Sequence, residues 1–311
     1  MKIVEAIKEF EFEQQIKGLS PRYIQLCQWR LNDWKTYTID ELNIDEVGQV
    51  TERHIKLFIR YRQRLAVEKN ITINNRLATL KVFFKFLVEI GVIEKEDNPM
   101  TDIKNLKEER RVITTFTDDE VKKLIDSTGS ATYTNIRDKT MLIFLFETGL
   151  RVSELVALKN EDVFLDRLFI RGKGSHERYV YISKKMRRQM KRYERAKKLR
   201  FEHLPSSMID DYYFLNQEAD GMSRSNVNKI LKRAGKRINI RDDIRCSPHD
   251  CRHYFAQKQI KQGIDVYTLS RLLGHSSIDI TTQYLRGLQM DDIINIGRRT
   301  APLNDIPVKL I

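Results

Sequence analysis

Two side chains near the start of one predicted helix have the types and the spacing of a phosphate-binding site. The segment Ser247-Pro248-His249-Asp250 has serine as N-cap and proline at the first helical position, so His249 falls in the first turn. Arg252 lies three residues later, on the same helix face as His249. Free amides at a helix N-terminus favour an anion, and an arginine fork adds charge-assisted hydrogen bonds. The pattern predicts a phosphate clamp.

A histidine and a tyrosine follow this helix. Gly274 ends a predicted helix over residues 266–273 and places His275 at a turn. Tyr284 comes nine residues later, in a short helix predicted over residues 280–285. Either residue alone is weak evidence, because most histidines are structural and a tyrosine at helical spacing usually belongs to a core.

Three charged residues earlier in the chain complete the set. Arg151 comes just after the predicted end of a buried helix at Gly149, and Glu154 lies one turn further on. Lys173 lies between glycines in the loop of a predicted β-hairpin. An arginine after a helix end is often only an ion-pair partner, and a loop lysine is usually solvated. Only the joint pattern is specific.

Four segments carry this joint pattern: TGLRVSEL, GKGSHERYVYI, SPHDCRH and LGHSSIDITTQY. In this order and at these separations they resemble the catalytic boxes of the tyrosine recombinase family, which includes phage integrases and Xer-type recombinases. The resemblance implies a mainly α fold with a small β-hairpin. It also implies an N-terminal helical core-binding (SAM-like) domain followed by a C-terminal catalytic domain.

The resemblance assigns a role to each matching residue. Tyr284 would attack a scissile DNA phosphate and form a 3′-phosphotyrosyl link with a free 5′-hydroxyl. Arg151 and Arg252 would hold the non-bridging oxygens in the transition state. Lys173 would be the general acid for the leaving 5′-hydroxyl.

The remaining matches are supporting groups. His249 and His275 would hydrogen-bond the phosphate and assist proton transfer, and Glu154 would orient a site residue. Cationic and imidazole groups can replace metal ions, so we expect no metal, no cofactor and no ATP. Two positions depart from the family pattern: Cys251 stands where relatives often have an aliphatic residue, and His176 replaces a commoner lysine or asparagine.

A zinc site is the competing interpretation of one segment. Cys246, His249, Cys251 and His253 lie within eight residues, and thiols with imidazoles can bind zinc. Their spacing fits no common zinc module, and the helix start would direct the cysteines away from the histidines. We therefore expect no metal here.

The composition agrees with a polyanionic partner. The 311 residues carry a net charge of +13. Residues 1–110 hold 19 Lys and Arg against 18 Asp and Glu, whereas residues 111–311 hold 37 against 25. Nearly all the excess positive charge therefore lies in the segment that carries the motifs. A neutral first segment can still bind DNA through one basic face.

Three parts of the chain are expected. Residues 1–108 read as a helical core-binding clamp, with helices predicted near residues 4–16, from Pro21, from Thr51 and over 73–90. A charged, proline-containing stretch then predicts a linker. Residues 114–290 form the expected catalytic domain, which is mainly helical with strands at 167–171 and 178–182. Residues 291–311 form a C-terminal tail that could pack on a neighbouring protomer.

A basic helix over residues 183–200 is a second candidate DNA contact. Lys185, Arg187, Arg188 and Lys191 belong to this stretch. A solvated helix face and a nuclear-localisation signal are the alternatives.

The expected partner is double-stranded DNA with paired half-sites. Four protomers would form the synapse and exchange strands through a Holliday junction, while the free protein would be a monomer or weak oligomer. No signal peptide or membrane span is evident, and three cysteines make no disulfide framework, so a cytoplasmic protein is expected. The biological outcome would be integration or excision of a mobile element, or resolution of DNA. A type IB topoisomerase and a non-catalytic DNA-binding regulator are the alternatives.

Overall fold

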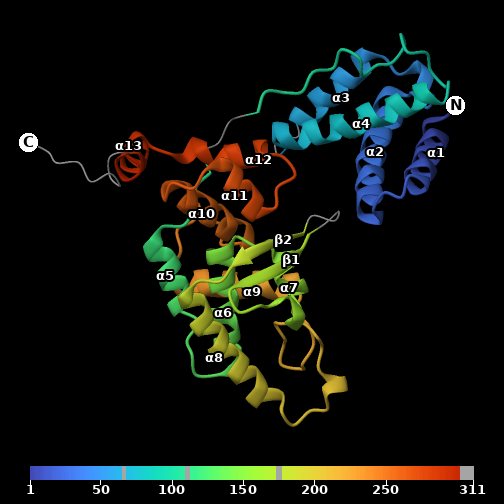
Figure 1. Cartoon of the computed structure of the whole chain (residues 1–311). Coiled ribbons are helices and arrows are strands. Elements are labelled where there is room, and N and C mark those ends of the chain that lie inside the picture. Colours follow the sequence, from blue (N-terminus) through green and yellow to red (C-terminus); the bar gives the residue numbers. More distant parts are fainter. Residues whose placement is uncertain (65–67, 109–112, 173–176, 302–311) are drawn as a thin grey trace, which may run out of the picture. The chain divides into compact units, whose positions relative to one another are not determined.

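The computed structural model describes residues 1–64, 68–108, 113–172 and 177–301. The chain folds as two compact units, Met1–Arg110 and Arg111–Ile311, which we treat separately. Among the described residues, no helix is both long and apolar enough to cross a membrane. Figure 1 labels the helices and strands.

Unit 1 is helical. Its elements are α1 (Ile3–Ile16), α2 (Pro21–Leu42), the short 3₁₀ helix η1 (Val47–Gln49), α3 (Glu52–Arg64) and α4 (Asn70–Glu89). Ser20 caps α2 and Pro21 opens it, as the sequence predicts. Helix α4 supplies the centre of the core, where Phe83 and Phe84 are fully buried against Trp34.

Four charged side chains form a network in unit 1, in which Arg76 is buried and the other three are partly buried. Arg62 and Arg76 both bind the carboxylates of Asp33 and Glu68, at distances from 2.5 to 3.0 Å. Burial would raise the pKa of the Glu68 carboxyl, but hydrogen bonds and charges of the two arginines outweigh it and hold that pKa at about 2. This network joins α2, α3 and α4.

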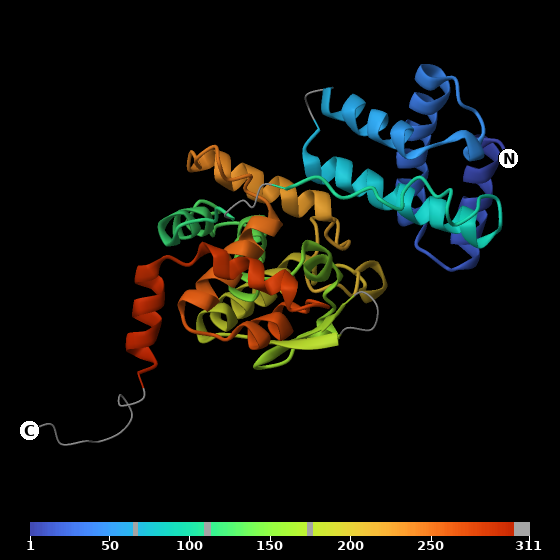
Figure 2. The ribbon, with the colours of Figure 1, turned by 90° about the horizontal axis from the view of Figure 1, so that it is seen from above.

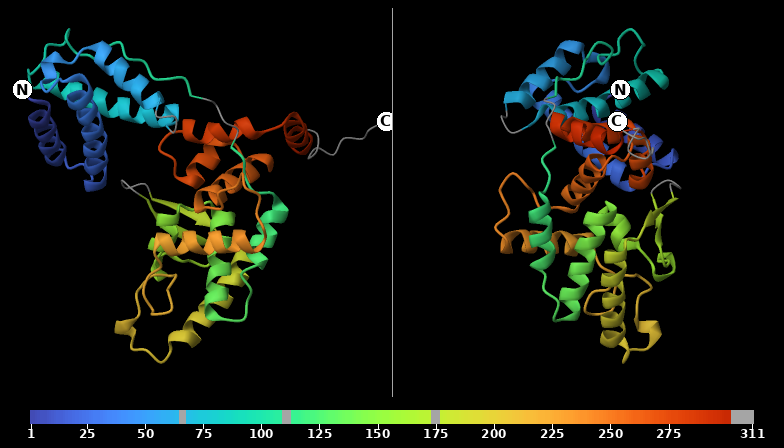
Figure 3. Two further views of the ribbon diagram at one scale, coloured as in Figure 1. Left: turned by 180° about the vertical axis from the view of Figure 1, so that it is seen from behind. Right: turned by 60° about the vertical axis from the view of Figure 1, so that its left-hand side comes forward.

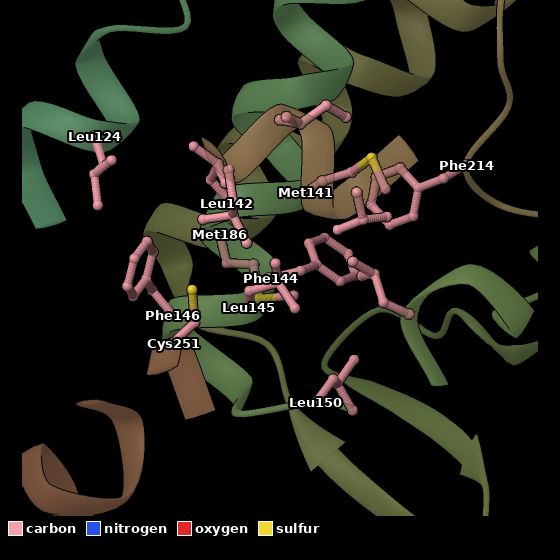
Figure 4. Packing of buried hydrophobic residues seen from close by; sticks show 14 of the residues in the cluster. Leu124, Met141, Leu142, Phe144, Leu145, Phe146, Leu150, Met186, Phe214 and Cys251 are labelled. Carbon is pink, nitrogen blue, oxygen red and sulfur yellow. The ribbon is translucent and has the colours of Figure 1, made fainter. Parts of the chain in front are cut away.

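Unit 2 begins with helices that surround a buried centre. They are α5 (Asp118–Asp126), α6 (Tyr133–Thr148), α7 (Val152–Ala157) and the 3₁₀ turn η2 (Asn160–Asp162). Residues 141–146 of α6 are apolar without interruption, which indicates that this half of the helix lies inside the domain. Its side chains Met141, Leu142, Phe144, Leu145 and Phe146 form the centre of the core in Figure 4, together with Phe214 and Met186 from other segments.

A two-stranded antiparallel hairpin covers one side of unit 2. Strand β1 (Arg167–Arg171) pairs with β2 (Glu177–Tyr181). Val180 and Leu168 face each other and are buried, and Ile170 pairs with Arg178 on the same inward face. A charged residue on this face requires a buried partner, which the site below provides.

Helices complete unit 2 after the hairpin. They are α8 (Lys184–Phe201), η3 (Ser206–Met208), α9 (Arg224–Arg237), α10 (Pro248–Lys261), α11 (Val266–Leu273), α12 (Asp279–Thr282), η4 (Gln283–Gly287) and α13 (Met290–Arg299). Helix α13 lies at the edge of unit 2 in Figures 2 and 3. The predicted mainly helical fold with one small hairpin is confirmed.

One predicted element near the site differs from the structure. The helix expected over residues 280–285 is two pieces, since α12 ends at Thr282 and the tighter 3₁₀ helix η4 carries Tyr284. Short 3₁₀ turns are common where a helix end must be repositioned. The change of helix type coincides with packing of Tyr284 against α10.

Candidate active site

The C-terminal end of α11 is the centre of the site. A helix end leaves carbonyl groups without internal partners, and these carry partial negative charge. Three consecutive carbonyls here each accept a hydrogen bond from an arginine of a different element. The pairs are Arg178 Nε to Leu272 O (2.7 Å), Arg252 Nη2 to Leu273 O (2.7 Å) and Arg151 Nη2 to Gly274 O (3.0 Å).

Gly274 makes this arrangement possible. Its backbone is left-handed, with φ +63°. A Cβ atom at this position would lie 2.8 Å from Nη1 of Arg178. Gly274 therefore ends α11, as the sequence predicts. Its lack of a side chain also leaves room for Arg178, which the sequence does not predict.

Glu154 is a buried carboxylate shared by two of the arginines. Its side chain is 5% exposed. Oε1 accepts from Nη1 of Arg151 and of Arg178 at 2.8 and 3.0 Å, and Oε2 accepts from the Arg151 amide and Nη2 of Arg178 at 2.9 and 2.8 Å. Burial would raise the pKa of the Glu154 carboxyl, but the hydrogen bonds and charge of Arg178, with those of Arg151, hold it below its ordinary value.

Arg252 is held in place by the start of α10. Ser247 and Asp250 form a reciprocal capping box and Pro248 is at the first helical position, which confirms the predicted helix start. The Arg252 guanidinium is buried and also donates to Gly149 O at 2.7 Å. Burial, with the nearby charge of Arg151, lowers the pKa of Arg252 to about 10, so the group stays cationic.

Tyr284 is buried and has one hydrogen-bond partner for its hydroxyl in the described part of the chain. Only 4% of the residue is exposed, and Oη lies 3.1 Å from Nδ1 of His253. Burial raises the pKa of the Tyr284 phenol, although the charges of Arg252 and Arg151 oppose the rise. Tyr284 packs in one apolar cluster with Leu273, whose carbonyl accepts from Arg252, so the tyrosine lies beside the arginine cluster.

Imidazoles occupy both sides of the arginine cluster. His249 is exposed in the first turn of α10, and its ring centroid lies 4.2 Å from that of His253. His275 follows α11, and its Nδ1 lies 2.8 Å from Oγ1 of the buried Thr281. Burial together with arginine charges lowers the pKa of His275 to about 4, so this ring is neutral at pH 7.

A hollow of about 660 Å³ opens beside Arg151. Arg171 and Arg224 also line it, with the hydroxyl-bearing Ser153 and Ser276. Cationic forks and hydroxyls are the groups that bind phosphate oxygens. The hollow therefore suits a polyanion.

The structure brings most of the sequence-predicted residues together. Arg151, Glu154 and Arg252 are joined through α11. His275 directly follows Gly274, and His249 is linked to Tyr284 through His253. Lys173 and His176 lie outside the described residues.

The basic residues of α8 are not part of this cluster. Figures 1 and 3 show α8 running away from α11 and α12. Lys185, Arg188 and Lys191 are exposed. Arg187 instead donates to the carbonyls of Phe164 and Leu165, which fixes the segment before β1.

Two site residues were not recognised from the sequence. Arg178 is the buried partner of Glu154, and the signal was a charge at an inward position of an alternating strand. His253 contacts Tyr284. The sequence indicated it by its four-residue spacing from His249, which places both histidines on one helix face, but that spacing was interpreted only as a possible zinc site.

The two cysteines near the start of α10, Cys246 and Cys251, are buried in the core. Cys246 Sγ lies 3.2 Å from Leu231 O, and Cys251 is fully buried. Burial raises the pKa of the Cys246 thiol to about 11. In the ranges that the structure describes, no three His, Cys, Asp or Glu side chains are grouped to hold a metal ion.

A helical fold that gathers arginines, imidazoles and a tyrosine beside an anion-binding hollow defines a class of enzymes that act on phosphate esters. Residues 114–289 match the phage integrase family. Tyrosine recombinase XerD of Listeria innocua serovar 6a is 30% identical over 272 residues, which cover 86% of this chain and 89% of the relative. Tyrosine recombinase XerC of Thermodesulfovibrio yellowstonii is 30% identical over 244 residues, covering 78% and 79%.

Solved structures share the fold. The Tn1549 transposon integrase in complex with transposon right end DNA has a TM-score of 0.72 and 20% identity, covering 97% of this chain and 100% of that one. A lambda integrase dimer bound to a core site has a TM-score of 0.71 and 16% identity, covering 93% and 97%.

The chain therefore belongs to the tyrosine recombinase (phage integrase) family and is a site-specific recombinase, an enzyme that cuts and rejoins DNA. The resemblance seen in the sequence, the expected fold class and the expected activity are confirmed. DNA is the partner that the net charge of +13 anticipates.

Replacing Glu154 with Gln should lower the free energy of unfolding at pH 7 by about 3–5 kcal/mol, because two arginines lose their shared buried charge. The pKa of Glu154 is lower in the folded protein than its ordinary value of 4.5. The stability that the carboxylate contributes is therefore fully present above pH 4.5 and is lost as the pH falls through the pKa of the folded state. The difference in the free energy of unfolding between wild type and E154Q should therefore become smaller below pH 4.5. Chemical denaturation at several pH values measures both effects.

Glu161→Gln is the matched control. Glu161 pairs with Arg171 on the surface, where its side chain is 61% exposed. Such a pair contributes about 1 kcal/mol or less. An E154Q protein as stable as E161Q at pH 7 would contradict the central role of the shared carboxylate.

Proposed function

We propose that Tyr284 is the nucleophile that attacks the scissile phosphate and forms a 3′-phosphotyrosyl link with a free 5′-hydroxyl. The observation that carries this proposal is the position of Tyr284 beside the arginine cluster, because it packs with Leu273, whose carbonyl accepts a hydrogen bond from Arg252. A covalent link conserves the energy of the broken bond, so the strand is rejoined without ATP.

Arg252 and Arg151 would bind the non-bridging oxygens of this phosphate. Charge on these oxygens rises as the pentacoordinate transition state forms, and fixed cationic donors stabilise it. The support is their preset orientation: each guanidinium already makes two hydrogen bonds to protein groups. Glu154 would orient Arg151 through the contacts described above.

His249 and His275 would donate hydrogen bonds to the phosphate. A Thr281 hydroxyl that donates to Nδ1 of His275 leaves the ring hydrogen on Nε2, which is then the donor to the substrate. Lys173 would be the general acid for the leaving 5′-oxygen. Its neighbour Gly172 lines the hollow beside Arg151, which supports this assignment.

The wider reaction follows from these roles. We expect two protomers on the paired half-sites of each duplex, and four in the synapse, to exchange strands through a Holliday junction in the cytoplasm. The outcome would be integration or excision of a mobile element, or resolution of DNA. The family match over residues 114–289 supports a catalytic domain over 114–290, with residues 1–108 as the second half of a DNA clamp.

Two further surfaces belong to this proposal. Lys185, Arg187, Arg188 and Lys191 of α8 would contact the DNA backbone, and three of them, all but Arg187, are exposed. The tail over residues 291–311 would pack on a neighbouring protomer. Met290, Ile293 and Ile294 of α13 are 45–69% exposed, which leaves apolar surface for such a contact.

Tyr284→Phe tests the nucleophile. The variant should fold normally, because it loses only one hydrogen bond, to His253. It should form no covalent complex with a nicked suicide DNA substrate, whereas the wild type should form one that survives denaturing electrophoresis. An adduct formed by the Phe variant would disprove the assignment of Tyr284.

Arg252→Ala tests the phosphate contact. Adduct formation should fall by at least about 10²–10³-fold, because a transition-state donor is lost. Gly149 O and Leu273 O lose their donors too, so the melting temperature should fall as well. Arg233→Ala, whose side chain is 62% exposed, should change neither. A wild-type cleavage rate in R252A would exclude this role.

Removal of residues 300–311 tests the tail. Cleavage by protomers bound to one half-site should persist, while synapsis and full recombination should weaken, because the apolar Ile306, Val308, Leu310 and Ile311 are removed. Gel-shift assays with one and two sites measure the two properties separately. Unchanged recombination by the truncated protein would remove the tail from the proposal.

A further inference from the structure

The histidine in contact with the tyrosine hydroxyl is not one of the two that the motif highlights. Nδ1 of His253 lies 3.1 Å from Tyr284 Oη. Among the described residues, neither His249 nor His275 makes a hydrogen bond to that hydroxyl. His253 therefore is the base that the geometry offers to the phenolic proton.

The contact is held by packing around it. The aromatic ring of Tyr284 belongs to a small apolar cluster that includes Phe255, Leu269 and Leu273. Glycine at position 287 lets η4 approach α10, because a Cβ there would lie 2.7 Å from Nε2 of Gln257. Gln257 lies four residues after His253 on the same helix face, and its Nε2 donates to Ile113 O. The imidazole and the phenol thus face each other from two closely packed elements.

A second imidazole connects this contact with solvent. The ring of His249 packs edge-on against the ring of His253, with centroids 4.2 Å apart. The ring of His253 packs edge-on against that of Tyr284, with centroids 5.5 Å apart. His249 is exposed, His253 is partly buried and Tyr284 is buried. The three rings form a row from the surface to the hydroxyl.

We propose that His253 accepts the phenolic proton of Tyr284 when the DNA phosphate is attacked, and returns it when the strand is rejoined. This inference rests on the proposed role of Tyr284. The Oη–H bond breaks and its proton moves to Nδ1, while Oη forms the bond to phosphorus. The bond from phosphorus to the 5′-oxygen breaks, and that oxygen takes a proton from the general acid. Rejoining reverses each transfer.

The charge state of the ring suits this task. Burial and the neighbouring His249 lower the pKa of His253 to about 4, so the imidazole is unprotonated at pH 7 and Nδ1 is free to take a proton. The low pKa also makes the free ring a weak base, and the negative charge of a bound phosphate would raise it. Burial raises the pKa of the Tyr284 phenol, so few molecules would ionise without a base.

His253→Gln tests the proposal, with His203→Gln as the matched control because His203 is exposed elsewhere in unit 2. Glutamine can still hydrogen-bond the phenol but cannot take its proton. The rate of adduct formation on nicked DNA should fall about 10²–10⁴-fold in H253Q, the range for loss of a general base, while DNA binding stays unchanged. H203Q should react like the wild type.

A more acidic nucleophile separates proton transfer from positioning. With 3,5-difluorotyrosine at position 284, the phenol is much more acidic than that of tyrosine, so its ionisation depends far less on a base. This replacement should restore most of the lost rate in H253Q. A loss that fluorination leaves unchanged would show that His253 only positions the ring and would overturn the proposal, as would a wild-type rate in H253Q.

Two controls keep the outcomes distinct. Failure of the wild type to form an adduct, or an adduct in Tyr284→Phe, would disprove the nucleophile rather than the base. If H253Q unfolds, the wild-type chain with difluorotyrosine at position 284 still tests the proposal. Proton transfer to His253 predicts that fluorination barely changes the rate of adduct formation. A wild-type rate that rises in step with phenol acidity would overturn the proposal.

Discussion

Three hydrogen bonds at the C-terminal end of α11 organise the active site. Guanidinium groups from α10, from β2 and from the segment before α7 would repel one another if they met without compensation. The carbonyls of residues 272–274 and the carboxylate of Glu154 supply that compensation. Because each arginine also belongs to a different element, the same bonds fix the hairpin, α7 and α10 relative to α11.

The electrostatics of the other groups follow from this cluster. Cationic arginines and burial together hold the pKa of His275 at about 4, so this imidazole stays neutral at pH 7 and serves as a hydrogen-bonding group. The same arginines oppose the effect of burial on the Tyr284 phenol. Positive charge in the site is therefore concentrated on fixed guanidiniums, which suits a phosphodiester whose own charge increases during reaction.

Local rules predicted much of the fold, because they act over a few residues. The helix start at Ser247, the glycine helix ends at Gly149 and Gly274 and the two strands all lie within a few residues of their predicted places. The prediction of one helix around Tyr284 was wrong. The position of Tyr284 depends on its contact with His253 of α10, which is 31 residues away in the sequence. The Arg187 guanidinium donates to protein carbonyls from another segment, a contact that no local pattern of residues predicts.

The sequence by itself identified the family, since side-chain types, their order and their separations match its motifs. It also indicated a polyanionic partner, because the net charge of +13 follows from composition alone. Only the tertiary structure decided which groups touch. Arg178 is the partner of Glu154, 24 residues away in the sequence, and His253 is the partner of Tyr284, 31 residues away. Such contacts depend on how helices and strands pack, and no local pattern of residues specifies that packing.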